Sequence, residues 1–340
     1  MADKKPSAKA LAWPIFDRIV ADGLSEWGTY TNPWMREAGS AVRFQPDYQT
    51  LQRLLGVPLY LRAETTTGVP ALALDVWLAY ELRRAGFSPD AVWPRATHPR
   101  ILPAAVSALL DALPKKQAEE LRERLVKDGS VRGVTQSSAS ILGKNYSKQV
   151  DVIMADWSTG PELLISTKRM DSSYGKNAPN RVEESYGDAK NLRLRHPLAA
   201  LGFVFGLRND VFDKEPLTAE WLLDLLGKLG REDDAYHATC VILMEYGQDV
   251  AQVQDSGRDD EDRAAAAGLT PVPLDEGEPV EVADSEIDRA LAQLPRVRID
   301  HSRTPLNLSP STFFASMVTH VLRTTPVNMH ANARRVRADV

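Results

Sequence analysis

The chain has 340 residues, of which 43% are hydrophobic and 26% charged, and its formal net charge is −5. This apolar fraction excludes a wholly disordered chain, and the lack of any apolar run of 18 residues excludes a membrane-spanning helix. The single cysteine, Cys240, excludes an internal disulfide and lies in an apolar run, which predicts a buried thiol. Because no apolar leader-like segment opens the sequence, we expect a cytoplasmic protein with no membrane partner.

Residues 1–135 are predicted to be mainly helical. Leu11, Ile15 and Ile19 share one face of an amphipathic segment, whereas residues 31–68 mix Pro, Gly and Asn and predict loops and short elements. Apolar periodicity, with proline near helix starts and glycine near helix ends, predicts the other helices over 69–88, 102–112 and 114–127.

Residues 136–250 show the pattern of a sheet with flanking helices. Runs of β-branched residues predict strands, and the turn-forming residues 157–161 predict that the first two strands form a hairpin. The order hairpin, helix, strand, helix, strand implies an α/β (α+β) fold around a central mixed sheet. The predicted strands are 150–156, 162–169, 200–207 and 237–246, with a loop over 170–180 and helices over 181–195 and 217–229.

The rest of the chain begins with an acidic segment. Residues 255–288 hold twelve Asp or Glu and two Arg, a local net charge of −10, and lack hydrophobic periodicity. We expect a mobile insertion or linker over 251–290, which either tethers its neighbours or occupies a basic groove as a DNA mimic. The remaining residues, 291–340, predict a C-terminal helical segment with a helix capped by Ser309 or Ser311.

The residues that suggest chemistry lie on the predicted hairpin. The sequence lacks GxxxxGK[ST], HExxH and GxSxG motifs, so P-loop NTPases, zincins and α/β-hydrolases are poor matches. Asp151 opens the first strand, and Lys168 ends the second on the same strand face as Ser166. The hairpin brings Asp151 and Lys168 to one end. A carboxylate that binds Mg²⁺ beside an ammonium that orients a water is suited to phosphodiester hydrolysis.

This arrangement resembles the PD-(D/E)xK nuclease superfamily, and its type II restriction endonucleases in particular, over roughly residues 69–246. The resemblance implies a restriction-endonuclease-like fold and Mg²⁺ as cofactor. The acidic residue that the family places two positions before the lysine is Ser166 here. A subset that recognises a CCGG core also carries Ser-x-Lys and takes the missing carboxylate from the following helix. Glu183 and Glu184 are the candidates for that carboxylate.

Three glutamates are therefore candidate metal ligands beside Asp151, and two of them could have purely structural roles. Asn180 and Glu183 have the spacing of a helix capping box, which would leave Glu184 as the ligand. Glu81, in the upstream helix, resembles the accessory metal ligand of the superfamily, but we favour a place on a solvated helix face for it.

The polar residues after Lys168 are candidates for DNA contacts. Their Lys, Arg, Asn and Ser side chains suit phosphates and base edges, and a loop after the catalytic strand commonly faces the groove in nucleases of this kind. A polar surface loop is the alternative, and cations near the end of the next helix also stabilise its dipole. The candidates are Arg169, Ser172, Ser173, Lys176, Asn177, Asn180, Arg181, Lys190 and Arg193.

The resemblance implies a Mg²⁺-dependent endonuclease of the restriction type, acting against phage or foreign DNA. Such enzymes cut double-stranded DNA as homodimers and have a cognate DNA methyltransferase in the same system. One alternative is a partner- or modification-dependent defence nuclease of the same fold. Another is a non-catalytic DNA-binding protein on a decayed nuclease fold, because Ser166 replaces a carboxylate.

Overall fold

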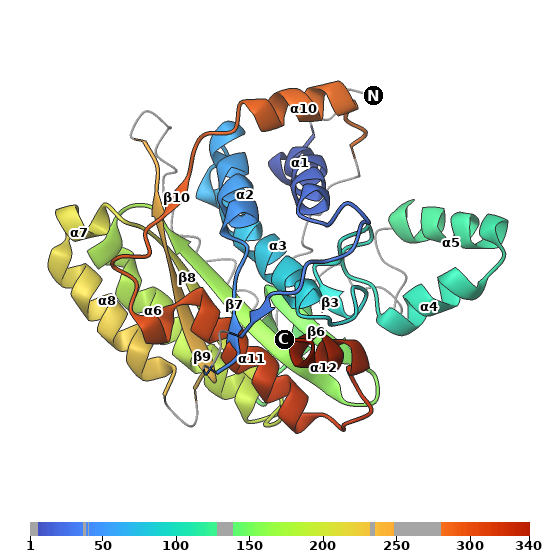
Figure 1. Cartoon of the computed structure of the whole chain (residues 1–340). Coiled ribbons are helices and arrows are strands. Elements are labelled where there is room, and N and C mark those ends of the chain that lie inside the picture. The colour runs from blue at the N-terminus through green and yellow to red at the C-terminus, as the bar shows by residue number, and fades with distance from the viewer. Residues whose placement is uncertain (1–5, 37–38, 40, 128–138, 232–234, 248–279) are drawn as a thin grey trace.

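A six-stranded mixed sheet forms the centre of the molecule (Figure 1). The computed structural model describes residues 6–36, 39, 41–127, 139–231, 235–247 and 280–340. The strands are β1 (Trp34–Met35), β2 (Arg43–Phe44), β3 (Val92–Trp93), β4 (Ser140–Leu142), β5 (Ser147–Gln149), β6 (Val152–Asp156), β7 (Gly160–Met170), β8 (Ala200–Arg208), β9 (Ala238–Glu245) and β10 (Arg298–Ile299). Six of them form the central sheet in the order β10-β9-β8-β7-β6-β3, and β1–β2 and β4–β5 form separate pairs.

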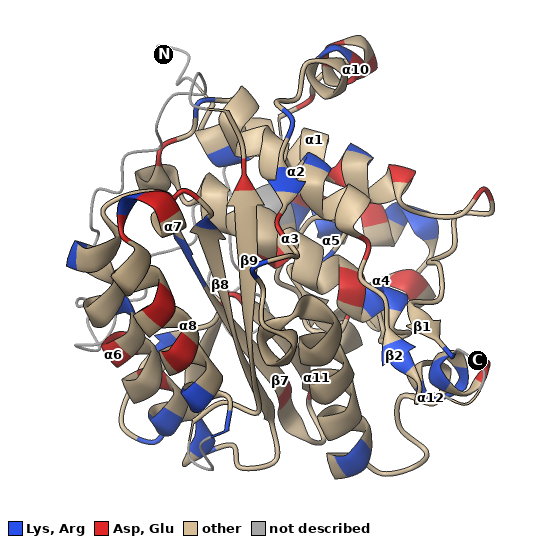
Figure 2. Ribbon diagram, turned by 60° about the vertical axis from the view of Figure 1, so that its left-hand side comes forward, with Lys and Arg blue, Asp and Glu red and all other residues tan. Residues whose placement is uncertain are grey.

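Helices cover both faces of this sheet. The helices are α1 (Ala8–Asp22), α2 (Tyr48–Tyr60), α3 (Val69–Arg84), α4 (Ala104–Ala112), α5 (Lys115–Lys127), α6 (Tyr174–Arg193), α7 (Val211–Lys214), α8 (Pro216–Leu229), α10 (Asp284–Ala292), α11 (Pro310–Thr324) and α12 (Ala331–Ala338). Helices α3 and α11 pack on one face, with α1 and α2 behind α3, whereas α6 and α8 pack on the other. Figure 2 shows few charged residues along the central strands β8 and β9, whereas the surrounding helices carry many.

The pairing and direction of the strands determine which side chains enter the apolar core on each face of the sheet. Strands β7, β8 and β9 are parallel, and β6 pairs antiparallel with β7 through a hairpin in which Val152 lies opposite Ile165. Side chains alternate along β7, so Ile165 joins the apolar core under α3 and Leu164 joins the core under α6. Every residue of β8 is buried, as expected for a central parallel strand covered on both faces.

The structure confirms the α/β class and most of the predicted elements. The predicted hairpin, the strands that became β8 and β9 and the helices that became α3, α4, α5 and α8 are all present. Pro70 lies in the first turn of α3, where its missing N–H costs nothing. Ser309, not Ser311, caps α11 by accepting a hydrogen bond from the Thr312 N–H. Cys240 is buried, and burial raises the pKa of its thiol.

The predicted N-terminal helical region and the sheet share one apolar core. Residues of α1, α2 and α3 pack in the same cluster as one face of the sheet and as α11. The prediction of loops over 31–68 was wrong at α2, whose Gly56 and Pro58 obscure the helical pattern. A Cβ at Gly56 would lie 2.9 Å from the Pro295 carbonyl oxygen, so close packing explains this glycine. Leu11 does not share the buried face of Ile15 and Ile19 as predicted, since it is 38% exposed.

Helix α6 starts seven residues before the predicted position. Strand β7 runs on to Met170, and the chain then turns through Ser173, whose φ of 53° lies in the left-handed region. The predicted loop over 170–180 is therefore largely helix. Because Asn180 and Glu183 lie inside α6, the capping box proposed for them was wrong.

Most of the predicted acidic linker lies outside the described residues, which omit 248–279. Its last residues, from Asp284, form helix α10 rather than a linker. This helix contacts α1, where Arg18 lies 3.3 Å from Asp288. The tether and DNA-mimic alternatives both remain predictions.

A half-buried histidine pair predicts acid sensitivity. The Leu201 N–H donates a 2.9 Å hydrogen bond to Nδ1 of His237, whose ring centroid lies 3.8 Å from that of the tilted His320 ring. Burial, with the nearby His320 and Arg193, lowers the pKa of His237 to about 3. The unfolded chain, with a His pKa of about 6.5, therefore binds more protons than the folded chain between these two values. Stability should fall as the pH falls from about 6.5 towards 3.

The variant His237→Asn tests this expectation, because its side-chain oxygen can still accept from Leu201 and does not titrate. Urea unfolding at pH 7 and pH 5 should show a smaller loss of stability at pH 5 in the variant than in the wild type. Equal losses in the two proteins would show that other groups cause the acid sensitivity.

Candidate active site

Asp151 lies beside the carboxyl-terminal part of β7. It directly precedes β6, and its Oδ2 accepts a 2.7 Å hydrogen bond from the Thr167 N–H. Ser166 and Lys168 point to the α6 side of the sheet, and Thr167 points to the α3 side. The hairpin thus places the Asp151 carboxylate beside the backbone of the Ser-x-Lys segment. The hydrogen bond from the Thr167 N–H fixes the orientation of this carboxylate.

Of the two candidate glutamates on α6, Glu184 faces Lys168. Its Oε1 lies 3.6 Å from Lys168 Nζ, and its side chain is 29% exposed. Glu183 is exposed and points to another side of the helix. The structure therefore brings Lys168 and Glu184 together next to the β6–β7 hairpin and leaves Glu183 outside.

Two further charged residues complete this side of the site, and sequence reasoning missed both. Lys148 on β5 lies 3.3 Å from the same Glu184 oxygen and 2.8 Å from Asp188 Oδ2. Tyr146 donates a 3.0 Å hydrogen bond to the other oxygen of Asp188. Burial raises the pKa of the Tyr236 phenol, and the charges of Asp188, Asp151 and Glu184 raise it further.

A further carboxylate approaches from the opposite face of the sheet. Asp75 on α3 is buried and accepts a 2.6 Å hydrogen bond from the Thr167 hydroxyl. Burial raises the pKa of Asp75 well above its ordinary value, and the charge of Asp151 raises it further. Thr167 therefore bridges two acidic side chains, through its amide to Asp151 and through its hydroxyl to Asp75. No local sequence pattern indicates this contact, which joins residues 92 positions apart.

The assignment of Glu81 as a metal ligand is not supported by its surroundings. Glu81 is fully buried, so the solvated-face alternative was wrong as well. Its Oε1 accepts a hydrogen bond from the Asp47 N–H at 2.6 Å, and its Oε2 pairs with Arg84 at 2.7 Å. Burial raises the pKa of Glu81 to about 7, and Arg84 opposes that shift. This carboxylate joins α2 to α3, and the α3 carboxylate that reaches the hairpin is Asp75.

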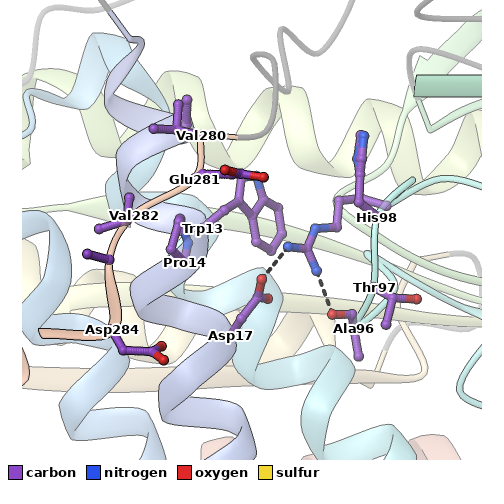
Figure 3. A pocket seen from close by; sticks show the side chains of 13 residues that line it. Trp13, Pro14, Asp17, Ala96, Thr97, His98, Val280, Glu281, Val282 and Asp284 are labelled. Atoms are coloured by element: carbon purple, nitrogen blue, oxygen red, sulfur yellow. Dashed lines mark hydrogen bonds and ion pairs between the residues drawn. The ribbon is translucent and has the colours of Figure 1, made fainter. Parts of the chain in front are cut away.

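A small cavity of about 60 Å³ reaches the acidic pair from the α1 side. Asp75, Asp151 and Trp13 are among the residues that line it. It is large enough to hold ordered water beside the two carboxylates. Trp13 and Arg100 also line a wider cavity of about 770 Å³ between α1 and residues 96–98 and 280–284 (Figure 3). There Arg100 is already paired with Asp17 at 2.6 Å, and it lies 4.0 Å above the Trp13 ring.

The predicted DNA contacts differ in burial and in their partners. Arg169 is buried and paired with Asp171 at 2.9 Å, so its assignment to DNA was wrong. Asn177 and Arg181 precede Glu184 at helical spacing, and these half-buried side chains form a row on α6 that leads into the site. Ser172 is half-buried, and Arg193 Nη1 lies 2.9 Å from His237 Nε2. The exposed candidates are Ser173, Lys176, Asn180 and Lys190.

Within the described part of the chain, no three Asp, Glu, His or Cys side chains converge as a ready-made metal centre. None of the described helices is long and apolar enough to cross a membrane. Comparison with protein-family models, with curated proteins and with solved structures finds no match to this chain. The candidate site is therefore defined by its own geometry.

Proposed function

We propose that the chain is a Mg²⁺-dependent DNA endonuclease with a restriction-endonuclease-like fold. The observation that carries the proposal is the position of Glu184. The sequence has Ser166, not an acidic residue, two positions before Lys168. Glu184 supplies a carboxylate instead, with its Oε1 3.6 Å from Lys168 Nζ. A Ser-x-Lys strand with a helix glutamate beside an orienting Asp151 is the arrangement that the resemblance to restriction endonucleases implies.

The donor set suits magnesium. Mg²⁺ is usually bound through one or two carboxylates, with waters and substrate phosphates as its other ligands, so three converging protein groups are not required. Asp151 and Glu184 would hold the ion. When bound, it would polarise the scissile phosphate and lower the pKa of a water.

The protein side chains supply orientation and charge. The Thr167 amide holds Asp151 by a 2.7 Å hydrogen bond and so fixes one carboxylate. The Lys168 ammonium, beside Glu184, positions the attacking water and offsets charge on the phosphate. Asn177 and Arg181, on the α6 face that carries Glu184, are suited to contacts with the backbone of double-stranded DNA.

A cleavage assay tests the proposal. Purified protein is incubated with unmodified plasmid and phage DNA in Mg²⁺, with EDTA as the metal-free control. We expect discrete fragments, and a loss of about 100-fold or more in rate for Lys168→Ala, the range in which positioned proton-transfer groups act. Lys116→Ala, at an exposed lysine of α5, is the matched control and should cleave normally.

DNA binding without Mg²⁺-dependent cleavage would contradict the enzyme and favour the non-catalytic alternative. Cleavage only of modified DNA, or only with an added factor, would favour the modification- or partner-dependent alternative. The sizes of the fragments would show whether the enzyme recognises a fixed sequence, and sedimentation of the DNA complex would test the expected homodimer.

A further inference from the structure

We infer that the ammonium of Lys148 is a built-in cation of this site, in the position where a second metal ion would otherwise bind. The inference deepens the proposed function and relies on it only for the metal ion at Asp151. Lys148 Nζ lies 2.8 Å from Asp188 Oδ2 and 3.3 Å from Glu184 Oε1. Glu184 and Asp188 are one helical turn apart on α6, so a single cation reaches both.

The fold holds Lys148 in this position from outside α6. Strand β5 pairs with β4, with Lys148 opposite Ile141, and the side chain of Asn191 on α6 clamps the turn between them. Asn191 Oδ1 accepts from the Asn145 N–H at 2.8 Å, and its Nδ2 donates to the Tyr146 carbonyl at 3.0 Å.

Close packing at the turn supports the clamp. A Cβ at Gly143 would lie 2.1 Å from the Asn191 amide nitrogen, so a glycine is required where the turn meets α6. Asn191 itself is 2% exposed. The Lys148 side chain is 13% exposed, in contrast to the exposed Lys144 of the same turn. Lys148 is thus positioned by a docked hairpin.

The charges explain why a cation is needed there. Asp188 is 8% and Glu184 29% exposed, so solvent screens the negative charges of this pair incompletely. An ammonium donates hydrogen bonds at the distances observed, whereas Mg²⁺ binds oxygen at about 2.0–2.1 Å. Both ions need the same oxygens, so Lys148 and a second metal ion exclude each other. The site is therefore a one-metal site in which Lys148 supplies the other positive charge.

Manganese binding tests this inference without relying on cleavage. Titration of the full chain with Mn²⁺, followed by electron paramagnetic resonance of the free ion, should give one site in the wild type and two in Lys148→Gln. The extra site should be lost in Lys148→Gln/Asp188→Asn, because Asp188 is the carboxylate of the pair that does not hold the first metal ion. Lys144→Gln, on the same turn, is the matched control and should keep the wild-type number of sites. Circular dichroism checks that each variant folds, and Lys148→Met is used if Lys148→Gln does not.

An unchanged number of Mn²⁺ sites in folded Lys148→Gln and Lys148→Met would overturn the inference. The wild type could also bind no Mn²⁺ while Lys148→Gln binds one ion. That result would support Lys148 as the cation and contradict the proposed metal at Asp151. The two proposals can therefore fail separately.

Discussion

Glu184→Gln is expected to lower the rate of DNA cleavage by about 100-fold or more, whereas Glu183→Gln should leave it within about two-fold of wild type. The amide keeps the size of the side chain but removes the charge that holds a metal ion. A bound metal supplies several kcal/mol of charge stabilisation, and each 1.36 kcal/mol corresponds to a ten-fold change in rate. Single-turnover cleavage of an end-labelled fragment at saturating Mg²⁺ measures the effect.

The neighbouring glutamate is the control that the structure provides. Both residues lie in the same turn of α6, but Glu184 is 3.6 Å from Lys168, and Glu183 is exposed to solvent. The two substitutions change the net charge equally, so a difference between them cannot come from general electrostatics. A loss of cleavage in Glu183→Gln with normal cleavage in Glu184→Gln would mean that α6 presents a different face to the site.

The hairpin and the parallel strands were predictable because their signal is local. The β-branched run that became β6 and the continuous apolar run that became β8 each show their pattern within one segment. Asp151 and Lys168 fell at the ends of the two hairpin segments, so two residues of the candidate site followed directly from the strand prediction. Asp75 and Lys148 did not, since their places depend on contacts between segments far apart in the chain.

The start of α6 shows how local preferences misled the prediction. Ser173, Gly175 and Pro179 favour turns, and they indicated a loop. The helical signal was nevertheless present, because buried residues recur at intervals of four or three along the whole helix: Tyr174, Ala178, Val182, Ser185, Ala189 and Leu192. Burial of this stripe against the sheet outweighs the preferences of single residues.

Local sequence also misled the prediction for Arg169, a charged residue. Its neighbours in sequence suggested a DNA-binding loop. Its side chain is instead 2% exposed and points to the α3 face of the sheet. It donates to Asp171 at 2.9 Å and to the Pro70 carbonyl at 3.2 Å. Tyr246 donates a further hydrogen bond of 2.6 Å to Asp171. The group ties the end of β7 to α3 and β9.

Arg169→Ala should therefore lower the free energy of unfolding by about 3–5 kcal/mol, the usual loss when one partner of a buried ion pair is removed. The loss arises because the Asp171 carboxylate stays buried without its cation. Adding Asp171→Asn should restore part of the stability, since the neutral amide needs no counter-charge. Urea unfolding of the two single variants and the double variant, combined in a double-mutant cycle, measures the coupling.

Lys176→Ala provides the contrast on α6. Its side chain is exposed, so the substitution should change stability by no more than about 0.5 kcal/mol while weakening DNA binding if this surface faces the phosphates. A stable Arg169→Ala variant with reduced DNA affinity would contradict the buried pair and return Arg169 to the DNA-binding surface. An unstable Arg169→Ala beside a stable, weakly binding Lys176→Ala would assign the two cations to different tasks, one within the core and one at the surface.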